Sequence, residues 1–286
     1  MRLGSTYPSL IFVHMRKSGG MTFAAITERQ FSADEVYKPE GSLEECRQEL
    51  RRLAPEQRDR LRCIHGHVPF GLDDCLPGPV AYVTLLRDPV ERILSVYYYA
   101  LRRPEWKAHE NIHKHGLSLD EFVASEFSSE FHNQQTQILS GSVAPFEDAE
   151  SLARAKENLD RFVVAGLTER FDETLMMCRR RLGWKRLHYS RRNVNRRRPG
   201  RDEIPASTLS LIEEKNAADI ELYDEVRRRF EETMRKYPEL DDDCRRFQRW
   251  NRLYGPAEGL LRRPALLKQR LHDLKRAREG STGRQG

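Results

Sequence analysis

The sequence predicts an α/β fold with a central, mainly parallel β-sheet flanked by helices. Short apolar runs typical of buried strands alternate along the 286 residues with segments of helical spacing. This order favours parallel strands joined by helices that cover the sheet. A hydrophobic fraction of 38% suffices for a sizeable core, and aromatic residues are spread over most of the chain, so disorder is excluded for most of it.

Three strand and helix units carry the prediction. Each has an apolar run, a polar loop and a helix-compatible stretch. In the first unit a strand at 9–14 precedes a helix at 21–30, and in the second a strand at 80–86 precedes a helix at 90–102. In the third, a strand at 162–166 precedes a helix that Thr168 caps and that runs through Leu182.

The segments between these units complete the expected fold. Residues 42–62 are helical with a break at Pro55, residues 63–68 are strand-like, and Ser118 begins a capping box with Glu121. Residues 144–160 and 207–237 have helical spacing. We expect one domain over 1–240 and a basic helical C-terminal extension over 241–286 with a frayed end at 280–286.

The positive charge of the chain lies in its C-terminal tail. The formal net charge is +6, but residues 245–286 hold twelve Lys and Arg against three Asp and Glu, so the rest carries −3. Residues 260–277 have the pattern of an amphipathic basic helix. We expect it to dock on the body of the protein, with another subunit or an anionic membrane surface as alternatives.

The composition also bears on the cellular location of the protein and on whether it binds a metal ion. No apolar stretch approaches the ~20 residues needed to span a bilayer, and residue 1 is not followed by a secretory signal pattern, so we expect a mature chain that starts near Met1 and is cytoplasmic. The five cysteines are widely spaced without a C-x-x-C pair, which favours small buried residues in a reducing compartment. The histidines His109, His113 and His115 lie in a polar stretch and do not by spacing alone make a metal site.

The loop after the first strand is rich in anion-binding groups. Gly19 and Gly20 allow a close backbone approach, the following helix offers unpaired N–H groups, and Lys17 adds a cation. Met15 and Arg16 stand before the lysine where a nucleoside-triphosphatase P-loop needs glycines. The loop is therefore predicted to cradle phosphate or sulfate without being a Walker motif.

The loop after the strand at 80–86 has a second set of anion ligands. Arg87 closes the strand, Pro89 opens a helix, and Ser95 lies two helical turns beyond Arg87, so the two side chains can share one phosphate. Arg92 is expected to form a structural ion pair with Asp88. Tyr97, Tyr98 and Tyr99 are expected to be mostly core, because three consecutive positions cover most of a helix circumference.

These loops resemble the donor-binding motifs of sulfotransferases that use 3′-phosphoadenosine 5′-phosphosulfate (PAPS). The sequence FVHMRKSGGMT at 12–22 is similar to their 5′-phosphosulfate loop, and LRDPVERILSVYYY at 86–99 is similar to their 3′-phosphate motif. HGHV at 65–68 resembles the His-Gly-His segment of the carbohydrate 2-O-sulfotransferase branch, which includes the heparan sulfate uronosyl enzymes. FHNQQ at 131–135, VAGLTERF at 164–171 and DIELY at 219–223 follow in the order expected of that branch, so the resemblance covers residues 9–230.

The resemblance implies a P-loop-like sulfotransferase fold and PAPS as co-substrate, released as PAP. The residues implied to hold the 5′-phosphosulfate are Lys17, Ser18, Gly19, Gly20 and Thr22, and those implied to hold the 3′-phosphate are Arg87 and Ser95. Met21 replaces a small hydroxyl residue of the family. His14 replaces an arginine implicated in acceptor contact in the heparan sulfate enzymes.

The chemistry of sulfuryl transfer requires a base and a cation. An acceptor hydroxyl needs a positioned base, for which His67 is the candidate, and Lys17 is placed to neutralise charge on the departing nucleotide. His65 has three open roles: orientation of the site, acceptor binding, or packing. No metal is required.

The sequence therefore favours an O-sulfotransferase acting on a saccharide or glycoconjugate, with no nucleic acid as partner. The alternative is a noncatalytic protein that binds nucleic acid or an anionic membrane through the basic loop at 191–198 and the tail. The same loop is open to two other interpretations, closing over the nucleotide or attracting an anionic acceptor. A nucleoside-triphosphate kinase is a weaker third option. Acceptor identity, regiochemistry and oligomeric state are not determined by the sequence.

Overall fold

Five parallel strands form one sheet in the order β2-β3-β1-β4-β5. The computed structural model describes residues 7–39, 41–141, 148–190 and 198–254. The strands are β1 (Ser9–Val13), β2 (Val36–Tyr37), β3 (Cys63–Gly66), β4 (Val80–Leu86) and β5 (Phe162–Leu167). The predicted α/β class with a central parallel sheet flanked by helices is confirmed.

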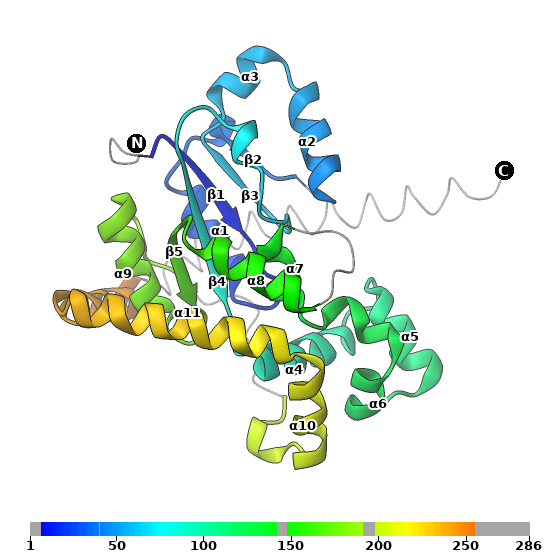
Figure 1. Ribbon diagram of the computed structural model, residues 1–286. Coiled ribbons are helices and arrows are strands. Elements are labelled where there is room, and N and C mark those ends of the chain that lie inside the picture. The colour runs from blue at the N-terminus through cyan, green and yellow to red at the C-terminus, as the bar shows by residue number, and fades with distance from the viewer. Residues whose placement is uncertain (1–6, 40, 142–147, 191–197, 255–286) are drawn as a thin grey trace.

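Helices cover the sheet and extend beyond one end of it (Figure 1). Those of the first half are α1 (Gly20–Glu28), α2 (Leu43–Arg52), α3 (Pro55–Arg60), α4 (Pro89–Ala100), α5 (Lys107–His115) and α6 (Leu119–Ala124). Those of the second half are α7 (Gln134–Ser140), α8 (Asp148–Leu159), α9 (Phe171–Leu182), α10 (Ala206–Lys215) and α11 (Ala217–Lys236). A further helix occupies residues 239–254.

Two apolar clusters stabilise this arrangement. The larger one contains the strands, all five residues of β1 being buried, together with the inner faces of α1, α9 and α11. The smaller one lies among α4, α5, α6 and α10, which Figure 1 shows grouped beside one end of α11. Strands buried on both faces explain the near-continuous apolar runs in the sequence.

The register brings the functional loops to one edge. Val13, the last residue of β1, pairs with Gly66 of β3 on one side and with Thr84 of β4 on the other. In a parallel sheet the carboxyl ends of neighbouring strands share an edge, and here β1 sits where the strand order reverses, the place where α/β folds bind ligands.

The local signals are mostly confirmed, with exceptions that have physical causes. The helices at 42–62 break at Pro55 as predicted, and Ser118 forms its capping box with Glu121. Thr168 does not cap α9, which begins at Phe171, because its hydroxyl donates to the carbonyl oxygens of Leu86 and Ser18. The stretch at 207–237 is divided between α10 and α11 at Asn216.

Several expectations concern residues outside the described ranges. The tail helix at 260–277, the frayed end at 280–286 and most of the basic loop at 191–198 lie there. Within the described residues, the extension begins with the helix at 239–254, and no helix is long and apolar enough to cross a membrane. Cys46, Cys63, Cys178 and Cys244 are buried thiols and Cys75 is half-buried.

Candidate functional site

A pocket of about 650 Å³ opens at the carboxyl edge of the sheet. Its walls come from the loop after β1, the segment after β3, α4 and the loop after β5. The predicted site residues that line it are Lys17, Gly19, Gly20, Thr22, His67, Arg87 and Ser95. The structure thus brings both predicted anion-binding loops and the candidate base into one cavity.

The loop after β1 is shaped by its two glycines. Gly19 has a φ of 71°, the left-handed conformation that glycine adopts without cost. A Cβ on Gly20 would lie 1.8 Å from ring atoms of His14, so only glycine fits there. These constraints allow α1 to begin with its N-terminus at the pocket wall.

Ser18, also a predicted ligand of the anion, does not itself line the pocket, but its hydroxyl tests whether an anion fits this loop. Its side chain is buried, and its hydroxyl has no hydrogen-bond partner among the described residues. A buried unpaired hydroxyl is destabilising, and an anionic oxygen in the adjacent pocket would accept its hydrogen bond. The residues present therefore fit a phosphosulfate group.

Lys17 faces a cationic and aromatic environment. Its Nζ lies 3.4 Å from the centre of the Tyr99 ring, over which Arg103 also lies. Burial, with repulsion from Arg87, Arg102 and Arg103, lowers the pKa of Lys17 to about 7. So many cations around one lysine favour an anion as the ligand of this pocket.

Arg87 connects the two loops. Its Nη1 donates to the carbonyl oxygen of Lys17 at 2.9 Å, and its Nη2 donates to Glu91 at 3.3 Å. Arg198 contacts the same Glu91 carboxylate and also lines the pocket, as does Ser95. Two guanidinium groups and a hydroxyl therefore surround one side of the cavity.

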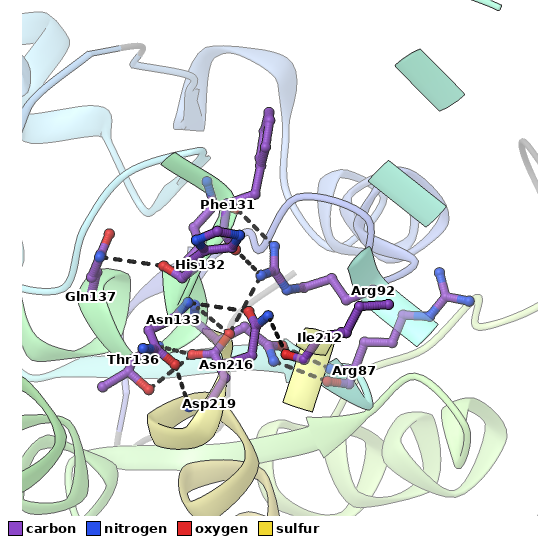
Figure 2. Close-up of polar contacts among 12 residues, drawn as sticks. Arg87, Arg92, Phe131, His132, Asn133, Thr136, Gln137, Ile212, Asn216 and Asp219 are labelled. Atoms are coloured by element: carbon purple, nitrogen blue, oxygen red, sulfur yellow. Dashed lines mark hydrogen bonds and ion pairs between the residues drawn. The ribbon is translucent and has the colours of Figure 1, made fainter. Parts of the chain in front are cut away.

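Figure 2 shows a polar network that includes Arg92 and Asp219 and reaches Arg87. Within this network the side chain of Gln135 clamps the backbone of Arg87. The Arg87 N–H donates to Oε1 of Gln135 at 2.9 Å, and Nε2 of Gln135 donates to the Arg87 carbonyl at 2.9 Å. The N–H of Gln135 in turn donates to the carboxylate of Asp219 in α11 at 3.2 Å. The position of Arg87 therefore depends on a buried polar network as well as on β4.

Arg92 belongs to that network, and its predicted pairing with Asp88 is wrong. Its fully buried guanidinium lies 3.5 Å from Asp219 and donates to the Phe131 carbonyl. Asp88 instead caps α4 by accepting from the Glu91 N–H at 2.9 Å. The structural role of Arg92 is confirmed with a different partner.

His67 lies just beyond the end of β3. Its Nδ1 is 2.9 Å from the carbonyl oxygen of His14, and because a carbonyl only accepts, Nδ1 carries the proton in this contact. In the neutral form of the His67 ring, the lone pair is then on Nε2. Burial, then the neighbouring His67, His65 and Arg16, lowers the pKa of His14 to about 3, so this second imidazole stays neutral.

His65 does not line the pocket. It is buried, and its Nε2 lies 3.1 Å from Glu28 in α1, which also pairs with Lys38 at 2.9 Å. The contact with His65, followed by that with Lys38, outweighs burial and lowers the pKa of Glu28 to about 2. This geometry favours packing and orientation over acceptor binding for His65.

The sequence did not single out the aromatic wall of the pocket. Of the three tyrosines expected in the core only Tyr97 is buried, while Tyr98 and Tyr99 line the cavity with Trp106. The sequence did contain a signal for this wall: three consecutive residues of a helix cannot all face one core, so at least one of the tyrosines had to point elsewhere. Arg198 was predicted only as part of the basic loop.

No group of three or more His, Cys, Asp or Glu side chains that could hold a metal ion occurs in the described part of the chain.

Comparison with known proteins gives a consistent set of relatives. Chicken heparan-sulfate 6-O-sulfotransferase 2 is 27% identical over 263 residues, which are 75% of this chain and 65% of the relative. Human heparan-sulfate 6-O-sulfotransferase 1 is 24% identical over 271 residues, 78% of this chain and 66% of the relative. Pig galactose-3-O-sulfotransferase 2 is 26% identical over 162 residues, 51% of this chain and 38% of the relative.

The chain is similar to carbohydrate sulfotransferases. The match spans slightly less than two thirds of the length of the chicken enzyme. No protein-family model matches the chain. Among solved structures, mouse sulfotransferase SULT7A1 complexed with PAP matches with a TM-score of 0.37 and 17% identity, over 62% of this chain and 58% of that one.

The carbohydrate sulfotransferase relatives correct two expectations. They are 6-O and 3-O enzymes, so the similarity supports carbohydrate sulfotransferases in general and not the 2-O branch in particular. The predicted cytoplasmic location is wrong, because heparan-sulfate and galactose sulfotransferases are Golgi-resident, membrane-associated enzymes.

Proposed function

We propose that this chain transfers a sulfuryl group from PAPS to a hydroxyl group of a saccharide. The observation that carries the proposal is the convergence of Lys17, Arg87, Ser95 and His67 on one pocket at the carboxyl edge of the sheet. The similarity to heparan-sulfate and galactose sulfotransferases supports a saccharide as the acceptor.

The two ends of the nucleotide have separate binding groups in this proposal. The backbone of Gly19 and Gly20, with the unpaired Ser18 hydroxyl, holds the 5′-phosphosulfate at the start of α1. Arg87 and Ser95 hold the 3′-phosphate, and Arg198 adds a second guanidinium there. When bound, PAPS supplies an activated sulfuryl group and leaves as PAP.

The catalytic steps fall to His67 and Lys17. Nε2 of His67 takes the proton of the acceptor hydroxyl as the oxygen attacks sulfur, while the His14 carbonyl keeps Nδ1 protonated. The Lys17 ammonium stabilises the negative charge that develops on the bridging oxygen of the departing nucleotide. No step in this scheme uses a metal.

The donor assignment predicts that Arg87→Ala abolishes selectivity for PAP. Loss of a charge-assisted hydrogen bond costs about 1.5–3 kcal/mol, so PAP affinity should fall about 10- to 100-fold. Calorimetric titration at one salt concentration would compare PAP with adenosine 5′-phosphate and ATP. Exposed Arg51 on α2 provides the control variant Arg51→Ala. A PAP preference that survives in Arg87→Ala would place the 3′-phosphate elsewhere.

The lowered pKa of Lys17 leads us to expect that the protein takes up a proton when it binds PAP above neutral pH. In the free protein the pKa of Lys17 is lowered to about 7, and a bound phosphate raises it again. The contribution of Lys17 to affinity is therefore complete below about pH 7 and declines as pH rises, by at most about tenfold per pH unit. Calorimetry near pH 8 in buffers of different ionisation enthalpy measures the uptake. Lys17→Arg stays charged and should show none; equal uptake would contradict the assignment.

A further inference from the structure

A second pocket of about 570 Å³ lies between α9, the segment at 184–188 and the helix at 239–254. Figure 1 shows that last helix, in orange, beside α9. Its lining combines cationic and aromatic side chains. These residues are Arg179, Trp184, Lys185, Arg186, Leu187, His188, Arg246, Phe247, Trp250, Asn251 and Tyr254.

Three of the cations of this pocket are not neutralised within the described part of the chain, whereas a fourth, Arg246, pairs with Asp243. Arg179, Lys185 and Arg186 are exposed, and none of them forms an ion pair with a described carboxylate. Arg180, the next residue after Arg179, does pair with Glu239 at 2.6 Å outside the pocket. No carboxylate lines the pocket, so its positive charge is left for an anionic ligand.

A flat aromatic surface adjoins these cations. Trp250 and Tyr254 are 60% and 53% exposed, although large aromatic side chains are usually covered. Their rings stack on each other with centroids 5.4 Å apart and planes inclined by 18°. Such a surface accepts the face of a sugar ring or a nucleobase.

The segment that carries Lys185 and Arg186 is held rigidly. Gln30 hydrogen-bonds both the N–H and the carbonyl of Lys185, at 2.9 and 2.7 Å. Arg186 has a φ of 54°, a left-handed conformation that is unfavourable for a non-glycine residue and persists only where its surroundings impose it. Trp184 and Leu187 anchor the segment in the core. Both cations are thus presented from a fixed backbone.

The segment that follows α9 contributes to two pockets: the second pocket and the first pocket at the carboxyl edge of the sheet, which the proposed function assigns to PAPS and which we call the donor pocket. His188 lines the second pocket and Tyr189 lines the donor pocket. The Tyr189 N–H donates at 2.7 Å to Asn251, a lining residue of the second pocket, and its hydroxyl donates to Asp172 in α9 at 2.7 Å. One segment of the chain therefore contributes to the walls of both pockets.

We propose that the second pocket is a subsite for an anionic saccharide chain, whose sulfate or carboxylate groups pair with Arg179, Lys185 and Arg186. The stacked rings of Trp250 and Tyr254 support its sugar faces. The volume of about 570 Å³ exceeds that of a single sulfate ion, so the pocket has room for more than an isolated anion. The choice of a saccharide over a nucleic acid as the ligand rests on the proposed function. The positive charge and the shape of the pocket are observations that do not depend on that function.

The test measures binding of a heparin-derived octasaccharide to the full chain by calorimetry at 150 mM salt, about the physiological ionic strength at which distant exposed charges are screened. Arg179→Glu with Lys185→Glu should lower affinity about tenfold or more. The matched control is Arg51→Glu with Arg52→Glu, the same change in charge on exposed positions of α2, far from α9 in Figure 1. Equal losses in the two variants would overturn the subsite.

Tryptophan fluorescence distinguishes binding of the octasaccharide in this pocket from binding to the basic tail. The octasaccharide should change tryptophan fluorescence in the wild-type protein and much less in Trp250→Phe, in which Trp184 is the remaining tryptophan of the pocket. A response of undiminished size in Trp250→Phe would overturn the subsite. A single-stranded DNA octamer that binds as tightly, and is weakened equally by the two glutamates, would overturn the saccharide assignment.

Titration of the same variants with PAP tests the proposed function separately from the proposed saccharide subsite. Arg179→Glu with Lys185→Glu should leave PAP affinity within about twofold, because neither side chain lines the donor pocket. Failure of the wild-type protein to prefer PAP would overturn the proposed function, while octasaccharide affinity would still decide whether the pocket binds anionic chains. Normal PAP binding with equal octasaccharide loss in both variants would overturn only the subsite.

Discussion

His67→Ala should lower turnover about 10²-fold or more, the usual contribution of a general base. The expected loss is in kcat, because in the proposed mechanism His67 acts on the acceptor hydroxyl and does not hold the phosphates of the donor. PAP affinity, measured by calorimetry, should therefore change little.

The neighbouring histidine provides the control for this prediction. His65 lies in the same segment, but its side chain contacts Glu28 in α1 and does not line the donor pocket. His65→Gln keeps a polar nitrogen near Glu28 and should retain turnover within a few-fold. Wild-type turnover in His67→Ala, or an equal kinetic loss in a folded His65→Gln, would remove His67 from the role of base.

The sheet and the donor pocket were predictable because their signals are local. Buried parallel strands appear as apolar runs, and a glycine turn between a strand and a helix marks a site of close approach to an anion. The topology then places the loops containing Lys17 and Arg87 at the same edge, since β1 and β4 are parallel neighbours. Residue type and the expectation of a parallel sheet were enough to predict the two loops, whereas the order of the strands comes from the structure.

The features that the sequence could not predict depend on distant segments. Spacing suggested Asp88 as the partner of Arg92, but the Asp88 carboxylate is used to cap α4. The true partner, Asp219, is brought in by the packing of α11 against α4 and α7. Likewise, only the position of α4 at the pocket wall decides that Tyr99 meets Lys17 while Tyr97 is buried.

Asp219→Ala should destabilise the protein by about 3–5 kcal/mol, the effect of breaking a buried ion pair. The Asp219 carboxylate is fully buried and accepts from the N–H groups of Gln135 and Thr136, as well as from the Thr136 hydroxyl. Its removal leaves these donors and the buried Arg92 charge without their acceptor. Urea unfolding would measure the loss.

A surface ion pair gives the comparison for that experiment. Asp160 pairs with Arg229 at 2.6 Å, but its side chain is 72% exposed, so Asp160→Ala should cost less than about 1 kcal/mol. Similar losses for Asp160→Ala and Asp219→Ala would mean that the buried network contributes little to stability.

The network also predicts a functional effect of a gentler change at the same position. Asp219→Asn keeps an oxygen acceptor but removes the charge that faces Arg92, so the fold should survive better than in Asp219→Ala. The clamp of Gln135 on the Arg87 backbone should loosen, because the N–H of Gln135 is held by Asp219. PAP affinity should then fall several-fold while affinity for adenosine 5′-phosphate, which lacks the 3′-phosphate, changes less. An unchanged PAP preference in a folded Asp219→Asn would show that β4 alone positions Arg87.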